Sequence, residues 1–272
     1  MAFKVALSAG HYLGNPKCCH KSLDPAETKE WVLNDRIADK LEKILSEYND
    51  IEVLRLDDTT GKKSVSNEER ARMANAWKAD FYLSIHHNAA NKVFNGGGIV
   101  AYIHSTNAKP GAAEWQKALY DACIKYTGLK GNRATPLAKA KLYECGAPNC
   151  PSVLMELGFM DSTQDVPVIL TDDYATKIAK ALAEVIIARS GAKKNTVAIL
   201  FPVLRRGDKG DAVKTVQRTL NALGYRDANG RSLSVDGSFG PATEYALKKY
   251  QEYERLTVDG ICGQQTWKSL LL

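Results

Sequence analysis

The strongest constraint on the fold is an alternation of short apolar runs with helix-like stretches over the first 190 residues. Five apolar runs of strand length occur there, and helix-like stretches lie between most of them. The runs are Lys4–Ser8, Ile51–Leu56, Phe81–Ile85, Gly98–Ile103 and Ser152–Leu157. Strands that alternate with helices are typical of a largely parallel sheet. The sequence therefore predicts an α/β fold with a mostly parallel sheet flanked by helices on both faces.

Capping residues mark where the helices are expected to begin. Asp24, Pro25 and Glu27 have the spacing of an N-cap, a first-turn proline and an acidic third position, so the first helix is expected to begin there. Its apolar positions from Trp31 to Leu45 recur at three- and four-residue steps. Later helices are expected at 66–77, 110–126 and 171–190, the first and last of them opened by a capping serine and threonine.

The last 70 residues have a different pattern, in which two segments repeat. Val235–Thr243 recurs 23 residues later as Val258–Thr266. A second, weaker repeat relates Val213–Gln217 to Leu247–Gln251. Each Asp-Gly turn precedes a threonine that is expected to cap a short helix, which predicts a small all-α domain. The expected division of the chain is 1–190, a linker without helical period at 191–202, and 203–272.

The charge and hydropathy of the chain exclude several classes of partner. The 37 Lys and Arg residues exceed the 31 Asp and Glu residues by six, and half of this surplus falls in each of the parts 1–202 and 203–272. An even and weak excess is not a nucleic-acid-binding patch, so nucleic acid is excluded as a partner. The apolar run Val197–Phe201 is too short for a membrane span, and membrane insertion is not expected. The N-terminus lacks the pattern of a secretory signal, so synthesis in the cytoplasm is expected.

Six cysteines are present, and we expect free thiols because no export signal is visible and the chain is long enough to bury a core. They are Cys18, Cys19, Cys123, Cys145, Cys150 and Cys262. Cys18, Cys19 and His20 together offer an alternative soft-metal site. Adjacent cysteines are poor ligands for one zinc ion, since known sites use spaced pairs, and a redox-sensitive loop is the better interpretation.

Side chains that bind metals follow the ends of two predicted strands. His11 follows the first strand, and His86 and His87 follow the third. Ligands bind beyond the carboxyl ends of parallel strands, where these histidines are expected to converge. Two imidazoles with a carboxylate from Glu27 or Glu30 would supply three protein ligands and leave one position open, as in catalytic zinc sites. A histidine after a strand is more often an ordinary loop residue, and either glutamate has a capping or solvated alternative.

Glu156 stands out because it interrupts an apolar strand. Val153–Met155 precedes it and Leu157–Phe159 follows it, so its carboxylate is expected to be flanked by core residues. Burial disfavours the charged form and raises a carboxyl pKa toward the range of a general base. We therefore interpret Glu156 as functional rather than structural.

Four short motifs occur in order over residues 1 to about 188. They are Ser8–His11, Glu30-x-x-x-Asn34, Ser84–Ala89 and Val153–Met160. In this order they resemble the zinc-dependent N-acetylmuramoyl-L-alanine amidases of the type-three amidase family. The resemblance implies that His11, Glu30 and His86 hold Zn²⁺, and that Glu156 is the catalytic carboxylate.

The resemblance also chooses between neighbouring candidates. The family's glutamate precedes an asparagine by four positions, which selects Glu30 over Glu27. The family pattern Ser-Ile-His-x-Asn-Ala selects His86 and leaves His87 in the variable position. The chain departs from the family at Tyr12, where the family usually has glycine.

A second set of motifs lies in the C-terminal part. They are Leu204–Gly210, Val213–Gln217, Leu220–Tyr225, the two Asp-Gly turns and Thr266-Trp267. Over 203–272 these resemble the type-one peptidoglycan-binding domain, a small three-helix module. Most of them are turn glycines and apolar core residues, so they locate the module without identifying its ligand contacts. Tyr225, Phe239 and Trp267 are expected in the core rather than in a groove.

Together the resemblances imply an enzyme that hydrolyses the amide bond between N-acetylmuramic acid and L-alanine in peptidoglycan. Zn²⁺ would polarise the carbonyl, Glu156 would move the proton, and the C-terminal module would hold the enzyme on its partner, bacterial peptidoglycan. A zinc peptidase that cuts the stem peptide, a non-catalytic wall-binding protein and a Cys-His peptidase are the alternatives. Without a signal, release through phage or mother-cell lysis is expected, as for an endolysin. The sequence leaves the oligomeric state and the wall type open.

Overall fold

The structure, a computed structural model, describes residues 2–129, 131, 136–194 and 201–271. The chain divides into two compact units, Met1–Asn195 and Thr196–Leu272. Residues 195–200 of the predicted linker lie outside the described residues, so the linker at 191–202 stays a prediction.

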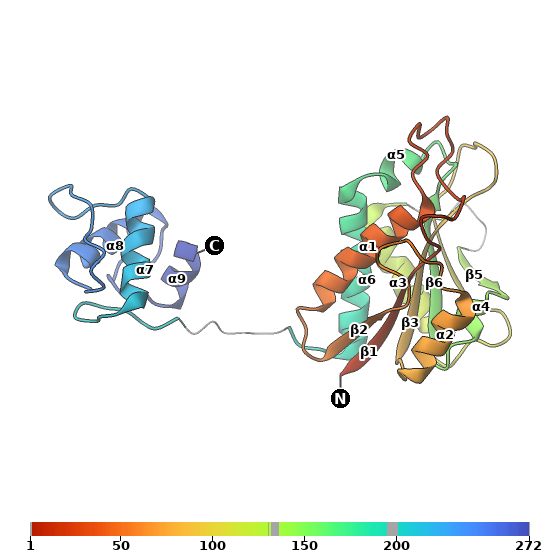
Figure 1. Cartoon of the computed structure of the whole chain (residues 1–272), viewed down its shortest axis with the longest axis horizontal. Coiled ribbons are helices and arrows are strands. Elements are labelled where there is room, and N and C mark those ends of the chain that lie inside the picture. Colours follow the sequence, from red (N-terminus) through yellow and green to blue (C-terminus); the bar gives the residue numbers. More distant parts are fainter. Residues whose placement is uncertain (1, 130, 132–135, 195–200, 272) are drawn as a thin grey trace. The chain divides into compact units, whose positions relative to one another are not determined.

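The N-terminal unit is built on a sheet of six strands among the described residues, in the order β2-β1-β3-β6-β4-β5 (Figure 1). The strands are β1 (Phe3–Ala9), β2 (Ile51–Arg55), β3 (Phe81–Asn88), β4 (Ile99–His104), β5 (Leu137–Ala140) and β6 (Ser152–Phe159). Neighbouring strands run parallel except β4 and β6, which are antiparallel. This confirms the predicted mostly parallel α/β sheet.

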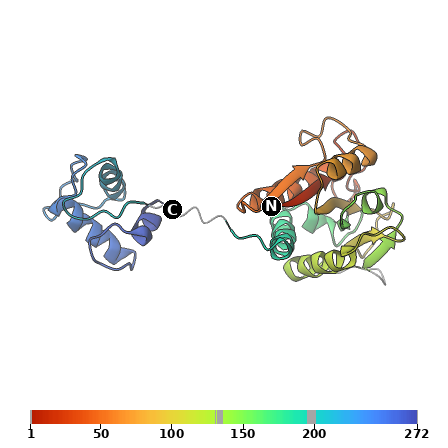
Figure 2. The ribbon, with the colours of Figure 1, turned by 90° about the horizontal axis from the view of Figure 1, so that it is seen from below.

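Helices cover both faces of this sheet (Figures 1 and 2). The helices are α1 (Glu30–Leu45), α2 (Asn67–Ala76), α3 (Ala112–Thr127), α4 (Tyr143–Gly146), α5 (Val166–Ile169) and α6 (Asp172–Ser190). Val5 and Leu7 of β1 face a large core that includes α1, α3 and α6, whereas Ala6 faces a smaller core that includes α2. Strands buried on both faces have continuous apolar runs, which explains why the sequence located them.

The predicted start of the first helix is wrong. The Asp24 carboxylate accepts hydrogen bonds from the backbone N–H groups of Ala26 (3.1 Å) and Thr28 (2.8 Å), and Glu27 has a φ of +49°. The aspartate therefore closes a turn, which competes with capping, and α1 begins only at Glu30.

The other two predicted caps are confirmed. The Ser66 hydroxyl accepts a hydrogen bond from Glu69 N–H, and the Thr171 hydroxyl accepts one from Tyr174 N–H. Each hydroxyl satisfies an N–H group that the first helical turn leaves without a partner. The helices they open, α2 and α6, begin at the next residue.

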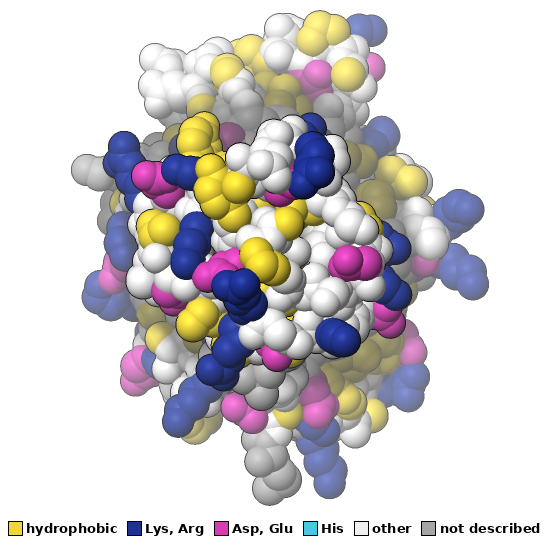
Figure 3. Space-filling view, turned by 90° about the vertical axis from the view of Figure 1, so that its left-hand side faces the viewer, with side chains coloured by type: hydrophobic (Ala, Val, Ile, Leu, Met, Phe, Trp, Pro, Cys, Tyr) yellow, Lys and Arg dark blue, Asp and Glu magenta, His cyan; other side chains and the backbone are white. Residues whose placement is uncertain are grey.

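The C-terminal unit consists of three helices among the described residues. They are α7 (Asp211–Ala222), α8 (Pro241–Tyr253) and α9 (Gln264–Leu271). Phe239 and Trp267 are buried in its core and Tyr225 packs against that core, which confirms the expected packing role of these aromatic residues. On the face of the molecule in Figure 3, basic side chains are interspersed with acidic and hydrophobic ones.

The repeated segments of this unit form the same hydrogen-bond network twice. The Gln217 carboxamide donates to Asp236 Oδ1 (3.0 Å), Ser238 O (3.0 Å) and Thr243 Oγ1 (3.2 Å), and accepts from Gly237 N–H (2.9 Å). The equivalent partners of Gln251 lie at the same distances: Asp259 Oδ1, Ile261 O, Thr266 Oγ1 and Gly260 N–H.

The predicted capping role of the repeated threonines is wrong. Thr243 and Thr266 lie inside the first turns of α8 and α9, after helix starts at Pro241 and Gln264. Each hydroxyl accepts a hydrogen bond from a buried glutamine instead, because the preceding turn directs the side chain into the core.

The six cysteines are free thiols, of which Cys18 is partly exposed and the other five are buried. Within the described ranges, no helix combines the length and apolar character needed to cross a bilayer.

Candidate metal centre and active-site cleft

His11, Glu30 and His86 converge at the carboxyl ends of β1 and β3, where His11 follows β1 but His86 lies within β3 rather than after it. His11 Nε2 lies 3.1 Å from Glu30 Oε2, and His86 Nδ1 lies 3.0 Å from Glu30 Oε1. One ligand atom from each residue falls within 4.8 Å of the others. His11 has a φ of +69°, a conformation that is uncommon outside glycine and that clusters at functional sites. The structure thus brings together the three residues that the resemblance selected.

The two oxygens of the Glu30 carboxylate have different surroundings. Oε1 receives His86 Nδ1 and the backbone N–H of His87 (3.2 Å), whereas Oε2 is buried and has no hydrogen-bond partner among the described residues. Burial alone would raise the pKa of Glu30, but the adjacent His11 and His86 side chains hold that pKa far below its usual range. Lys17 Nζ lies 3.8 Å from Oε2. A buried, charged oxygen between two imidazoles has the donor chemistry of a divalent metal site.

His86 lies between two carboxylates. Its Nε2 is 3.4 Å from Oε2 of Glu144, and its Nδ1 is 3.0 Å from Oε1 of Glu30. Burial alone would lower the pKa of His86, but Glu144 and Glu30 raise it to about 10. A carboxylate oxygen therefore lies beside each ring nitrogen of His86.

The neighbouring candidates have other partners. His87 Nδ1 lies 2.8 Å from Asn34 Oδ1, and burial lowers the pKa of His87 to about 4. Glu27 is exposed on the turn before α1. Asn34 also donates to the backbone oxygen of Gly10 (3.1 Å), which ties the loop that follows β1 to α1.

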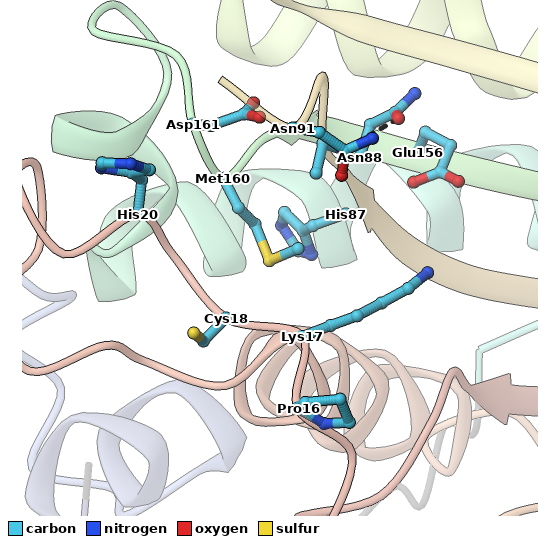
Figure 4. A pocket seen from close by; sticks show the side chains of 11 residues that line it. Pro16, Lys17, Cys18, His20, His87, Asn88, Asn91, Glu156, Met160 and Asp161 are labelled. Atoms are coloured by element: carbon cyan, nitrogen blue, oxygen red, sulfur yellow. Dashed lines mark hydrogen bonds between the residues drawn. The ribbon is translucent and has the colours of Figure 1, made fainter. Parts of the chain in front are cut away.

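Glu156 lies on β6, directly opposite His86 in the parallel β3–β6 ladder. Its carboxylate borders a cavity of about 540 Å³ (Figure 4). The lining residues are Pro16, Lys17, Cys18, His20, His87, Asn88, Ala89, Asn91, Glu156, Met160 and Asp161. The cavity joins the candidate catalytic carboxylate to a polar surface on which part of a substrate can lie.

The alternative site at Cys18, Cys19 and His20 does not assemble in the described part of the chain. Cys19 is buried in the main core, whereas Cys18 and His20 line the cavity. His20 Nδ1 is 2.9 Å from Ser22 Oγ. The three side chains therefore do not face a common point.

Two charged residues at the site were not found from the sequence. Arg70 is buried and donates to the backbone oxygens of Ala9 (2.9 Å) and His11 (3.0 Å). Glu144 is only 4% exposed. Burial alone would raise the pKa of Glu144, but the adjacent His86 and the nearby positive charge of Arg70 lower that pKa to about 2. Neither residue interrupts an apolar run, so local patterning carried no signal for them.

A family model described as N-acetylmuramoyl-L-alanine amidase matches residues 5–188. The chain belongs to this amidase family. A second model, described as a peptidoglycan binding domain, matches residues 209–270 of the amidase.

Individual relatives agree with the family match. An N-acetylmuramoyl-L-alanine amidase from Bacillus licheniformis is 28% identical over 57% of this chain and 58% of its own length. The endolysin of Bacillus phage SPP1 is 30% identical over 72% of this chain and 69% of its own length. The crystal structure of an N-acetylmuramoyl-L-alanine amidase from Clostridium difficile 630 has a TM-score of 0.63 at 24% identity, and the match covers 71% of this chain and 98% of that one. The structural likeness establishes the shared fold.

The amidase is therefore an enzyme that hydrolyses peptidoglycan at the N-acetylmuramoyl-L-alanine bond, as the sequence predicted. Its C-terminal unit is a peptidoglycan-binding domain, which makes peptidoglycan the substrate and partner of the chain.

Proposed function

We propose that the amidase is a zinc enzyme in which His11, Glu30 and His86 hold the metal and Glu156 transfers the proton. The observation that carries this proposal is the buried Glu30 Oε2, which has no hydrogen-bond partner among the described residues and faces His11 Nε2 at 3.1 Å. Two imidazoles and one carboxylate form the three-ligand set of a catalytic zinc site. Zn²⁺ held by these residues would supply a Lewis acid for the scissile carbonyl and would lower the pKa of a bound water.

The ligands are held in place by contacts outside the metal site. Arg70 fixes the backbone carbonyl of His11, and Asn34 fixes that of Gly10. The loop that carries His11 is therefore tied to two helices, one of which carries Glu30. Preorganised ligands of this kind bind a metal without first ordering a loop.

Glu156 acts as general base and then as general acid. Its carboxylate accepts a proton from the attacking water as the new C–O bond forms, and returns it to the alanine nitrogen as the C–N bond breaks. Its position on a central strand opposite His86 holds it at a fixed distance from the ligand set. The products are the lactyl carboxylic acid of the glycan and a stem peptide with a free amino group.

We assign the cavity beside Glu156 to the stem peptide or the sugar next to the scissile bond. Asn88, Asn91 and Asp161 give it amide and carboxylate groups that match the amides and hydroxyls of peptidoglycan. The volume, about 540 Å³, falls within the usual range of about 300–1,000 Å³ for small-ligand sites.

The C-terminal domain holds the enzyme on the insoluble polymer, which raises the effective concentration of cleavable bonds. We propose that the amidase acts on the bacterial cell wall after release by lysis. The likeness to a relative named an endolysin supports this setting.

Mass analysis of products from purified peptidoglycan tests the proposal. The enzyme is expected to release intact stem peptides with a free L-alanine amino group, and a chelator is expected to stop the release until Zn²⁺ is restored. Release of peptide fragments from a stem still attached to the glycan would instead support a zinc peptidase.

Three variants test the assignment of the residues. Glu30→Gln is expected to lose Zn²⁺ binding in a chelator-competition titration, whereas Glu27→Gln, which changes an exposed glutamate three positions earlier, retains it. Glu156→Gln is expected to bind Zn²⁺ like the parent but to lose about 10²–10⁴-fold in turnover. Near-parent turnover of Glu156→Gln would contradict the assigned role.

A further inference from the structure

Glu144 is a buried carboxylate that the proposed reaction does not use. It lies on the four-residue helix α4, and three hydroxyl groups donate to its Oε1. They are Tyr82 Oη (2.7 Å), Ser84 Oγ (3.1 Å) and Ser8 Oγ (3.2 Å). The other oxygen, Oε2, faces His86 Nε2 at 3.4 Å.

We propose that Glu144 is a positioning residue that fixes the His86 ring, holding the proton on Nε2 and presenting the Nδ1 lone pair to the metal site. This inference rests on the proposed role of His86 as a metal ligand. A neutral imidazole carries its proton on one nitrogen, and an acceptor beside that nitrogen selects the tautomer. Carboxylates behind ligating histidines orient the ring and raise its basicity.

The surroundings of His86 leave its ring little freedom. A Cβ atom at Gly10 would lie only 2.1 Å from His86 Cε1 and 2.4 Å from Nε2, so the glycine backbone packs closely against the ring. Nδ1 is 3.0 Å from Glu30 Oε1. Nε2 is buried and makes no hydrogen bond in the described part of the chain, and Glu144 Oε2, at 3.4 Å, is the carboxylate oxygen that faces it.

The cluster also links the two imidazoles. Arg70 donates to Ser8 Oγ, and Ser8 in turn donates to Glu144. The same guanidinium holds the backbone oxygen of His11 at 3.0 Å. One buried network therefore positions His86 through its ring and His11 through its backbone. Burying a carboxylate is costly unless it is hydrogen bonded, and each oxygen of Glu144 has a defined partner.

Zinc affinity of full-length variants tests the inference. Glu144→Gln keeps an acceptor but removes the charge, and Glu144→Leu removes the acceptor. By chelator competition, we expect Zn²⁺ to bind about tenfold more weakly to the first and about 100-fold more weakly to the second. Tyr82→Phe is the matched control, because it removes a hydrogen bond to the other oxygen of the same carboxylate. It is expected to lower the urea midpoint and leave the zinc affinity unchanged.

Long-range ¹H–¹⁵N NMR of the zinc-loaded parent reads the tautomer directly and needs no variant. The proton of His86 is expected on Nε2, and a proton on Nδ1 would overturn the inference. Parent-like zinc affinity in Glu144→Leu would overturn it as well. If the proposed zinc site itself is wrong, His86→Ala is expected to bind Zn²⁺ as tightly as the parent. This result is distinct from the two that would overturn the role of Glu144.

Discussion

Gln217 and Gln251 offer a matched pair of perturbations in the peptidoglycan-binding domain, because the same network surrounds both. Each carboxamide is buried and takes part in four hydrogen bonds. Leucine has nearly the same volume but no polar atoms. Gln217→Leu and Gln251→Leu therefore remove the hydrogen bonds with little change in packing.

The cost follows from the groups that lose their partner. In Gln251→Leu, the buried N–H of Gly260 is left unpaired and Thr266 Oγ1 loses a donor. A buried polar group without a partner costs about 1–3 kcal/mol, so we expect a loss of about 2–4 kcal/mol. A unit of this size, Thr196–Leu272, has a total stability of about 4–12 kcal/mol. Each substitution therefore removes a large share of the stability of its domain.

Amide hydrogen exchange followed by mass spectrometry measures this loss in the full chain, because peptides from 203–272 report on this domain alone. Since 1.4 kcal/mol corresponds to a factor of ten, protection of its core amides is expected to fall by about 30–700-fold. Gln265→Leu, at an exposed glutamine of the same domain, is the control and is expected to change stability by less than about 0.5 kcal/mol. Unchanged protection in Gln251→Leu would refute the reasoning. Effects that differ by several kcal/mol between the two variants would refute the equivalence of the repeats.

Three further predictions concern the metal site, the reactivity of the cysteines and the role of the C-terminal domain. Gly10→Ala is expected to abolish zinc binding with the fold retained in circular dichroism, because the added Cβ would overlap the ring of His86. Native protein treated with iodoacetamide is expected to be labelled at Cys18 alone, since burial raises the pKa of the other five thiols; peptide mass mapping checks this. Deleting 203–272 is expected to reduce co-sedimentation with cell walls more than cleavage of soluble muropeptides, and equal sedimentation would exclude a targeting role.

Most strands were predictable because nearly every residue along each of them is buried. Strands buried on both faces need apolar residues at every position, and that requirement is visible locally. The direction of β4 was not predictable, because an apolar run looks the same in a parallel or an antiparallel neighbour. Strand β5 was missed because Leu137–Ala140 is short, lies at the edge of the sheet and keeps its side chains partly exposed.

The first helix shows how one local signal can compete with another. Asp24 followed by proline satisfies the rules for an N-cap and equally those for a turn closed by the aspartate side chain. Whether Asp24 caps the helix or closes a turn depends on the position that Glu30 takes beside the two imidazoles. That position is set by the tertiary structure and not by the local sequence. In the observed fold the helix begins at Glu30, so the carboxylate projects from the first residue toward His11 and His86.

Glu156 and Glu144 show the limit of what a sequence reveals about such a site. Glu156 could be selected from the sequence because its own neighbours in the chain are apolar on both sides, and its catalytic role stays a prediction. The environment of Glu144 is created by Ser8, Tyr82 and Ser84, which lie 136, 62 and 60 residues away. A side chain that acts through another side chain needs only to reach it, so its neighbours in the chain carry no signal. The proposed ligand motif is therefore readable without Glu144, and the zinc affinity of Glu144→Leu measures how strongly the geometry of that motif depends on this carboxylate.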